Sequence, residues 1–544
     1  MNILMLNCDL GPLPEHTVTQ LRLNHGGIIS IRRILKAQLG DNHDYHPDLF
    51  IQRELLGQRL FIADLSELPC LKVFWAIDSH LNLFWHHWYA KLFDLTITPH
   101  PHLFADLPPE WKIPHILSFP VPGYKRAFLP HAERNHFASF VGVITKFREQ
   151  RARFAQFLSD HYDVHAQKLP FQTMLERYDA SRVLPNESIC REFNFRIMEG
   201  ASSGCCVLTE DIGDDLACNF SPDKEVLTYR HVCELDELLS FLQNRPYLSE
   251  KIGKAAWERV QKEHLPAHRW QQLLAKIATL TPKPLTNEDA DRFVLFAAIE
   301  AARGDHAIST LNDLIHPLEE LEEKDDVLAM KIRIAMELGK QKEAVALVRT
   351  ILDEPETMER GFDVPLCAMC AGLRSSDKEL ITRVKKRFSH FFSEPAEHPF
   401  ELYYLLAKRF FMKKRFARPG ARFEEATSIP DSALECLYLA ESYADSDERK
   451  HRLHQAFTEI ADALPFLSFN IKSWAEYSLD HQDDWLASFN YAFCALREFR
   501  LEEGLAELRA THFLAKQKQE TELFMEKIGR HGLRQALQKA LASH

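Results

Sequence analysis

Residues 191–209 read REFNFRIMEGASSGCCVLT, and this stretch decides the fold expected for the chain. It predicts a loop, a helix beginning near Asn194, a Ser-Ser-Gly turn and an apolar strand. A helix start with Arg196 in its first turn can hold a diphosphate through backbone N–H groups and the guanidinium. A carboxylate at Glu199 can accept hydrogen bonds from both hydroxyls of a ribose. An ordinary capped helix with a surface Arg–Glu pair explains the same residues equally well.

Around this stretch, short apolar runs alternate with helical spacing. We expect buried parallel strands at 2–7, 49–52, 60–63, 73–77 and 95–98, with a helix at 28–39. A second series begins at residue 137 with ASFVGVI and continues with a helix at 148–158, strands at 162–165, 181–184, 205–209 and 226–229, and a helix at 235–244. The fold class predicted is α/β, with two Rossmann-like lobes at about 1–125 and 126–280.

After the Thr-Pro-Lys-Pro linker at 281–284, strand-like runs end and apolar spacing of three and four residues continues to the C-terminus. We therefore expect an all-α domain at 285–544. Residues 335–351 and 492–508 look like helix-turn-helix units of a tetratricopeptide (TPR) repeat, which presents concave surfaces to polypeptides. A generic helical bundle is the alternative.

Composition excludes several functional classes. The formal charge of -12 and the pI near 6.1 argue against nucleic-acid binding. No apolar stretch is long enough to form a transmembrane segment, and the N-terminus resembles a strand, so we expect a cytoplasmic protein. The histidines follow no metal-ligand spacing, and one CxxC pair, Cys367 and Cys370, stands without a second pair. We expect no metal and no cofactor.

Three ordered motifs carry a resemblance to a known family. They are FRIMEGASSGCCVLTE at 195–210, LACNFSPDKEVLTYR at 216–230 and IGKAAWERVQKEHLPAHRW at 252–270. Weaker matches lie upstream, at 46–52, 72–82, 140–154 and 178–186. Together they resemble the GT-B glycosyltransferases, specifically the CgeB-like (spore maturation protein-like) bacterial group, over roughly residues 1–275. The helical region lies outside the resemblance.

The resemblance implies a set of donor-binding residues. Glu199 would bind the donor ribose, while Arg196, Arg151 and either Lys146 or Arg148 would neutralise the pyrophosphate. The set is completed by Gly142, Asn186 and Gly200. GT-B enzymes are typically metal-independent, because basic side chains and a helix dipole stabilise the departing nucleoside diphosphate.

One departure from the family concerns stereochemistry. Many retaining GT-B enzymes have two glutamates separated by seven residues, yet Arg191 stands where the first would be, and Glu192 is one position away. A retaining mechanism of that type is therefore in doubt.

In the first lobe, Asp78 and His80 follow an expected strand and should lie at its carboxyl end. Either could be the catalytic base that deprotonates an acceptor, whereas Asp78 could instead cap the next helix. Gly26 and Gly27 form an acceptor-side loop or a plain turn. An aromatic cluster around Trp75, Trp85 and Trp88 could stack on sugars or form core.

These observations predict a glycosyltransferase, a hexosyl- or related transferase. It would move a sugar from a UDP- or GDP-sugar to an acceptor, such as a flagellin-like protein or a surface glycan recruited by the helical domain. The alternative is a non-catalytic helical-repeat scaffold with a degenerate GT-B portion.

Overall fold

The computed structural model describes residues 1–40, 46–105, 107, 111–145, 148–304, 310–355, 360–392, 398–464 and 467–542. The chain folds into two compact units, one containing Met1–Ser118 and Lys276–Leu453, the other Phe119–Ala275 and His454–His544. Each unit combines one α/β lobe with part of the helical region. The helices after residue 284 thus fall into both units, and the three-domain division stays a prediction.

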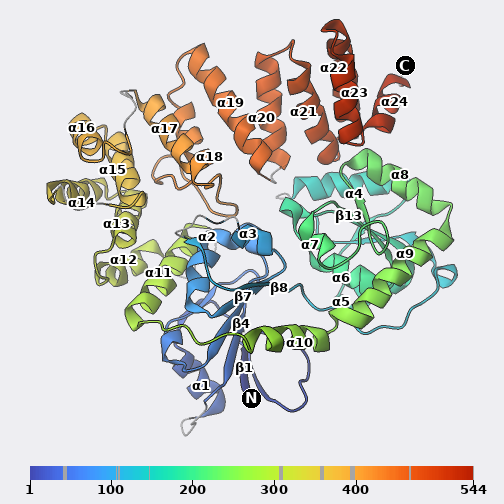
Figure 1. Cartoon of the computed structure of the whole chain (residues 1–544), viewed down its shortest axis with the longest axis horizontal. Coiled ribbons are helices and arrows are strands. Elements are labelled where there is room, and N and C mark those ends of the chain that lie inside the picture. Colours follow the sequence, from blue (N-terminus) through green and yellow to red (C-terminus); the bar gives the residue numbers. More distant parts are fainter. Residues whose placement is uncertain are drawn as a thin grey trace. The chain divides into compact units, whose positions relative to one another are not determined.

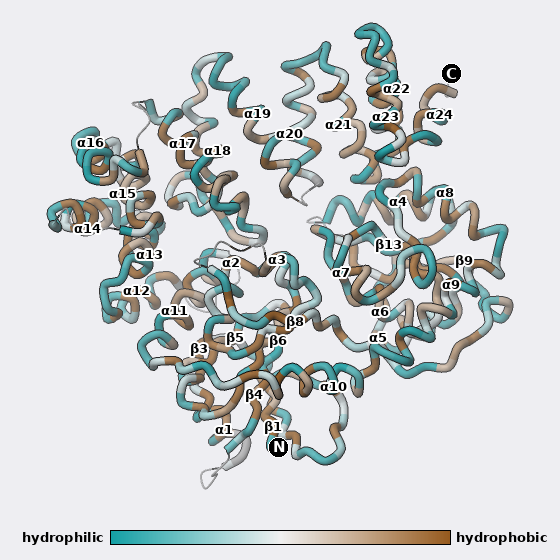
Figure 2. The backbone as a smooth tube through the Cα atoms, viewed as in Figure 1, coloured by the Kyte–Doolittle hydropathy of each residue, from teal (hydrophilic) through white to brown (hydrophobic). Residues whose placement is uncertain are grey.

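The first lobe is built on a six-stranded parallel sheet in the order β2-β1-β4-β6-β7-β8 (Figure 1). Its strands are β1 (Asn2–Leu6), β2 (Thr17–Leu21), β4 (Leu49–Arg53), β6 (Leu71–Trp75), β7 (Leu95–Thr98) and β8 (Ile116–Ser118). The strands β4 and β6 are largely hydrophobic (Figure 2), as expected where both faces of a parallel sheet are covered. The helices of this lobe are α1 (Ile31–Leu39), α2 (Ser79–Tyr89) and α3 (Pro101–Ala105).

Three features of this lobe differ from expectation. The edge strands β2 and β8 were not predicted, because β2 reads TVTQL and is mostly exposed, without an apolar run. The helix expected at 28–39 begins only at Ile31, because the Ser30 side chain caps it by accepting from the Arg33 N–H. The preceding residues form β3 (Gly27–Ile29), which pairs with β5 (Leu60–Ile62).

The second lobe has a four-stranded parallel sheet in the order β9-β12-β13-β14, and β10 pairs separately with β11. The strands are β9 (His136–Ala138), β10 (Phe140–Val141), β11 (Ala166–Gln167), β12 (Ser181–Asn186), β13 (Cys206–Glu210) and β14 (Leu227–Tyr229). The helices are α4 (Glu149–Tyr162), α5 (Phe171–Asp179), α6 (Phe195–Ser202), α7 (Asp214–Ala217), α8 (Val232–Gln243), α9 (Pro246–Arg259) and α10 (Pro266–Ile277). The strand expected at 162–165 is wrong, since α4 continues to Tyr162 and ends at Asp163 in a left-handed conformation.

The rest of the described chain is helical, as expected. Its helices are α11 (Asn287–Arg303), α12 (Leu311–Glu319), α13 (Asp325–Glu337), α14 (Gln341–Asp353), α15 (Asp363–Arg374), α16 (Lys378–Arg387), α17 (Pro399–Met412), α18 (Ala433–Glu441), α19 (Asp447–Ala463), α20 (Leu467–Asp480), α21 (Trp485–Arg497), α22 (Leu501–Gln517), α23 (Thr521–Arg530) and α24 (Arg534–Ala542). Both expected helix-turn-helix units are present, as α13–α14 and α21–α22. The fold class of two Rossmann-like lobes followed by helices is confirmed, while a TPR-type repeat stays a prediction.

Each lobe shares a hydrophobic core with helices of the C-terminal region. In the first unit, α11 packs on α2, and residues such as Phe296 join the core that contains Phe61 and Trp85 (Figure 1). The aromatic cluster near Trp75 and Trp85 is therefore core, because those two side chains are buried. In the second unit, α21 to α24 complete the core of the second lobe.

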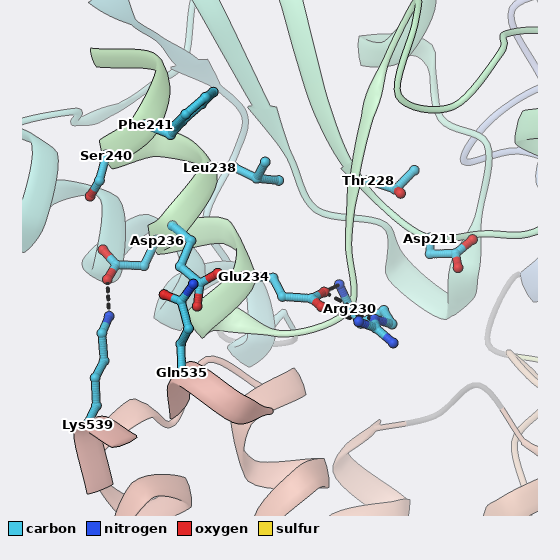
Figure 3. Close-up of a pocket in the computed structure, with 11 residues that line it drawn as sticks. Asp211, Thr228, Arg230, Glu234, Asp236, Leu238, Ser240, Phe241, Gln535 and Lys539 are labelled. Carbon is cyan, nitrogen blue, oxygen red and sulfur yellow. Dashed lines mark hydrogen bonds and ion pairs between the residues drawn. The ribbon is translucent and has the colours of Figure 1, made fainter. Parts of the chain in front are cut away.

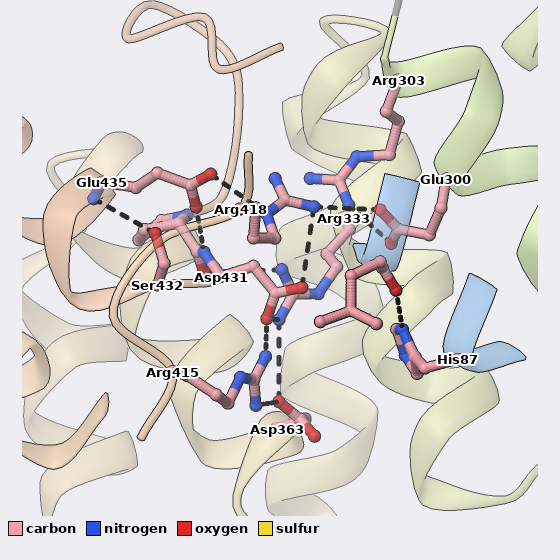
Figure 4. Close-up of polar contacts among 12 residues, drawn as sticks. His87, Glu300, Arg303, Arg333, Asp363, Arg415, Arg418, Asp431, Ser432 and Glu435 are labelled. Carbon is pink, nitrogen blue, oxygen red and sulfur yellow. Dashed lines mark hydrogen bonds and ion pairs between the residues drawn. The ribbon is translucent and has the colours of Figure 1, made fainter. Parts of the chain in front are cut away.

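A network of buried ion pairs holds an irregular segment, residues 413–432, in place within the first unit (Figure 4). Arg418 pairs with Glu300 at 2.9 Å and with Glu435 at 3.0 Å. Asp431 accepts from Arg333 at 2.9 Å and also pairs with Arg415. These side chains are nearly inaccessible to water, so each charge depends on its partners.

The same segment reaches helix α2 of the first lobe. Gly420 has φ 75°, and a Cβ there would lie 2.1 Å from the carbonyl oxygen of Leu81. The Arg415 guanidinium lies 4.5 Å from the Trp111 ring, which in turn stacks on His87 at 4.2 Å. The helical region therefore contacts the helix that follows Asp78.

Candidate functional site

Helix α6 forms where the decisive stretch predicted it, with Asn194 in the N-cap position. Gly200 lets the helix approach the sheet, because a Cβ there would come within 2.2 Å of Leu184 Cδ2 and 3.1 Å of Val207 Cγ2. Gly204, at φ 72°, closes the turn into β13. Close packing against the sheet thus accounts for a glycine at position 200, with no need for a ligand contact.

Arg196, in the first turn of α6, is 8% exposed and held on several sides. Its Nη1 donates to Asn186 Oδ1 at 2.6 Å and to Glu187 Oε2 at 3.0 Å, and its Nε donates to the Val141 carbonyl at 3.2 Å. The guanidinium lies 4.6 Å above the centre of the Phe140 ring. A cation held on so many sides keeps one orientation, as a preorganised anion site requires.

Arg151 and Arg196 meet at one carboxylate, that of Glu187. Arg151 on α4 pairs with Glu187 Oε1, while Arg196 takes Oε2, and Glu187 is fully buried. The trio carries two positive charges and one negative charge. The surplus cation can bind an anionic ligand without leaving a buried carboxylate unpaired.

The nearby Glu210, at the end of β13, does not cancel this surplus. Burial, together with the charge on Glu187, raises the pKa of Glu210 to about 8 against the opposing effect of Arg497. Glu210 is therefore mostly uncharged at neutral pH. Gln150 donates to its Oε1 at 3.2 Å.

Glu199 lies one helical turn beyond Arg196 and is partly buried. Burial raises the pKa of its carboxyl to about 7, although Arg196 acts in the opposite direction. The same carboxylate and burial raise the pKa of Tyr124 to about 12. A group that is half ionised at neutral pH and partly shielded from water suits hydrogen bonding to sugar hydroxyls.

Two more predicted donor residues join this cluster. Asn186 ends β12, is fully buried, and donates from Nδ2 to Thr209 Oγ1 at 2.9 Å while it accepts from Arg196. Gly142 lies against the guanidinium, because a Cβ there would be 3.1 Å from Arg196 Nη2. Sequence reasoning missed Glu187, although it directly follows Asn186, the last residue of the family match at 178–186.

Two predicted donor residues remain, and the structure describes only one of them. Arg148 is exposed at the start of α4, and Lys146 falls outside the described residues. Arg191 is also exposed and has φ 59°. Arg191 stands where the first glutamate of a retaining pair would be, and the doubt about a retaining mechanism stays a prediction.

In the first lobe, Asp78 occupies the N-cap position of α2 but makes no side-chain capping bond. Its backbone N–H donates to Glu54 Oε2 at 3.0 Å. Burial opposes ionisation of Glu54, yet His86 and Arg59 more than offset it and lower the pKa of Glu54 to about 2. Glu54 therefore stays charged and holds the turn before α2, a role that the sequence did not reveal.

His80 is 7% exposed, and its ring meets that of His100 edge-on at 5.3 Å between centroids. His100 follows β7, the neighbour of β6 in the sheet, so the two rings come from adjacent strand ends. The base role of Asp78 or His80 stays a prediction.

One of the two glycines in the acceptor-side loop has a positive φ angle. Gly27 has φ 141° and its N–H donates to the Arg59 carbonyl at 2.8 Å. The loop leads into strand β3 and not directly into a helix. A role for Gly26 and Gly27 in binding an acceptor stays a prediction.

A pocket of about 810 Å³ lies elsewhere in the second unit, between α8 and α24 (Figure 3). Both of its cations are paired, Arg230 with Glu234, and Lys539 with Asp236 at 2.6 Å. Of the predicted site residues that the structure describes, none lines this pocket.

The described part of the chain contains neither a group of side chains placed to bind a metal nor a helix suited to cross a membrane. There, no three His, Cys, Asp or Glu side chains are arranged to hold a metal ion. Cys367 and Cys370 are buried within α15, and burial raises the pKa of both thiols, to about 11 and about 12. None of the described helices has the length and apolar character needed to cross a membrane.

Several solved structures share limited similarity with the chain. They include a GtfA/B complex (14% identity, 45% of this chain and 60% of that one, TM-score 0.31) and the pneumococcal O-GlcNAc transferase GtfA in complex with UDP and GlcNAc (12%, 46% and 60%, 0.33). A third is sucrose-phosphate synthase from Thermosynechococcus elongatus (12%, 51% and 99%, 0.34). The chain thus spans 60% of the length of the first two, and these scores are too low to support any argument about its activity.

The sequence matches no curated protein. One family model does match, over residues 125–275, and it describes the family as glycosyl transferase-like. The matched residues span the second lobe, with α6 and the whole Arg151–Glu187–Arg196 trio. Residues 125–275 are therefore similar to the glycosyl transferase-like family.

Proposed function

We propose that the chain is a glycosyltransferase that uses a nucleotide-sugar donor, held by the second lobe. The observation that carries the proposal is the arrangement of Arg151 and Arg196 around the single carboxylate of Glu187, at the start of α6. This arrangement supplies one uncompensated cation beside a helix N-terminus. A nucleoside diphosphate needs both, because it develops negative charge as the glycosidic bond breaks.

The rest of the donor would follow along α6. Glu199 lies one turn further on and would accept hydrogen bonds from the ribose hydroxyls in its ionised form. The nucleotide is a UDP- or GDP-type donor, and the reaction proceeds without a metal, because the uncompensated cation and the N-terminus of α6 together take the role of a divalent ion.

The acceptor side of the proposal belongs to the first lobe. Asp78 or His80 would act as the base that deprotonates an acceptor hydroxyl. A flagellin-like protein or a surface glycan is the proposed acceptor, which the helical region would recruit. Membership of the CgeB-like group and a cytoplasmic location are parts of this proposal.

The test is donor binding and turnover by the full chain. We expect nucleotide release from a panel of UDP- and GDP-sugars, and its loss in Arg196→Ala and Glu199→Ala. Arg245→Ala is the matched control, because Arg245 is an exposed arginine at the start of α9 in the same lobe. If no donor on the panel binds or turns over while the full chain captures a protein partner, the scaffold alternative replaces the enzyme.

A further inference from the structure

The turn between α21 and α22, residues 498–500, is buried against the second lobe. Phe499 is 6% exposed although it lies in a turn. Arg153 on α4 makes two hydrogen bonds to the turn. Its Nε donates to the Glu498 carbonyl at 2.9 Å, and its Nη2 donates to Glu498 Oε2 at 2.8 Å. A residue distant in sequence is thus fixed to the helix that carries Arg151.

The backbone of this turn is strained. Phe499 has φ 61°, a left-handed conformation that is unfavourable for a non-glycine residue. The comparable turn between α13 and α14 uses Gly339 at φ 71°, where an added Cβ would meet nothing within 4 Å. A helix-turn-helix in this chain therefore does not need a buried aromatic residue at that position. Ser376 and Gln519 have the same left-handed backbone in other turns and are exposed, so this turn is distinguished by its buried ring, which packs on the second lobe.

One route of direct contacts leads from Phe499 to the guanidinium of the proposed donor site. The Phe499 ring meets Phe154 edge-on at 5.0 Å, and Phe154 meets Phe140 edge-on at 5.1 Å. Arg196 then lies 4.6 Å above the Phe140 ring. Each pair is in van der Waals contact, so a shift of the first ring displaces the next.

A second route ends on the same side chain. The rings of Phe499 and Tyr229 lie 6.3 Å apart. The Tyr229 hydroxyl donates to the Asn186 carbonyl at 2.7 Å, and Asn186 Oδ1 accepts from Arg196 at 2.6 Å. Phe499 thus supports both the ring beneath Arg196 and the amide that orients it.

We propose that Phe499 is a positioning residue for the donor site, and that the helical region orients Arg196 through it. This inference rests on the proposed function, because Arg196 matters here as a ligand for a nucleoside diphosphate. A guanidinium fixed from beneath and from one side is ready for the diphosphate. A guanidinium that is free to move must become ordered when the diphosphate binds, and this ordering weakens the affinity for the nucleotide.

Isothermal titration of the full chain with UDP and GDP tests this inference. Phe499→Leu keeps an apolar side chain but breaks the ring contacts. Phe524→Leu is the matched control, since Phe524 is fully buried in α23 of the same unit and its ring contacts are with Trp485, Phe489 and His512. Both variants should have a lower melting temperature than the wild type. Only Phe499→Leu should bind the nucleotide about tenfold or more weakly.

If both variants bind the nucleotide alike, Phe499 is merely structural and the inference is overturned. Should Phe499→Leu fail to fold, Arg153→Gln provides the same test, because it loosens the turn from α4 without opening the core. Its control is Arg530→Gln, an exposed arginine of α23 paired with Glu526. Equal affinity in these two variants also overturns the inference. A wild type that binds neither nucleotide instead refutes the proposed function and leaves no site to position.

Discussion

Replacing Glu199 with glutamine should raise the stability of the protein while weakening its hold on a nucleotide. Burial raises the pKa of Glu199 from 4.5 to about 7, against the opposing charge of Arg196. Only the ionised carboxylate can accept both hydrogen bonds from a ribose diol. The free protein near pH 7 therefore holds this residue about half in its binding form.

The expected size of the binding effect follows from the ionised fraction. With a pKa of about 7, roughly a tenth of Glu199 is ionised at pH 6 and roughly nine tenths at pH 8. Apparent affinity scales with the competent fraction, so nucleotide affinity should rise about tenfold between these pH values. The terminal phosphate of UDP also ionises, with a pKa of about 6. The effect of Glu199 is therefore the difference between wild type and Glu199→Gln in how steeply nucleotide affinity changes with pH.

The stability effect has the opposite sign. The folded pKa is above the unfolded one, so the contribution of Glu199 to stability is fully present below about pH 4.5 and is lost as the pH rises through about 7. That shift corresponds to on the order of 3 kcal/mol. Glu199→Gln should therefore raise the melting temperature, relative to wild type, more at pH 8 than at pH 5.

Isothermal titration with UDP and GDP, and thermal melts across the same pH range, measure both effects. Glu258→Gln on α9 is the control, because Glu258 is an exposed carboxylate in the same unit. A nucleotide affinity with the same pH slope in wild type and Glu199→Gln would refute the binding argument. An unchanged stability difference at pH 5 and pH 8 would refute the burial argument.

Other substitutions test other parts of the structure. Arg196→Ala should weaken binding of UDP or GDP by about tenfold to a hundredfold in calorimetry, because a charge-assisted bond contributes about 1.5–3 kcal/mol. Gly420→Ala should lower the melting temperature far more than Gly57→Ala, since both glycines have positive φ but only the first would place a Cβ 2.1 Å from a carbonyl oxygen, that of Leu81. Asp431→Asn should destabilise the full chain by about 3 kcal/mol in thermal melts, because Arg333 and Arg415 each lose a buried ion pair and must then share Asp363.

The sequence predicted elements well where local signals are strong. Buried strands such as β1, β4 and β7 appear as short apolar runs, and α6 begins where the motif predicted it. The edge strand β2 was missed because its polar, exposed residues lack that run. In the candidate site, Arg196 was found from its motif, but Glu187 was not, because a carboxylate between two distant arginines leaves no local pattern.

The helical region shows a different limit of sequence reasoning. Periodicity predicts that helices form and which face of each is apolar, but it does not say what covers that face. The residues that join helices to lobes lie in turns and irregular segments, as Phe499 and Gly420 do, where apolar spacing carries no information. Their partners, Tyr229 and Leu81, are hundreds of residues away in sequence.

These contacts bear on what the helices do. A separate recruiting domain should leave the lobes intact when its own residues change. Here Gly420 lies against the first turn of α2, the helix that follows Asp78. Phe499 packs on Phe154, which in turn packs on the Phe140 ring beneath Arg196. Because each compact unit contains both a lobe and helices that complete its core, changes inside the helices should alter donor binding as well as any recruitment of an acceptor. Acceptor recruitment and control of the site therefore need not be separate roles of the helices.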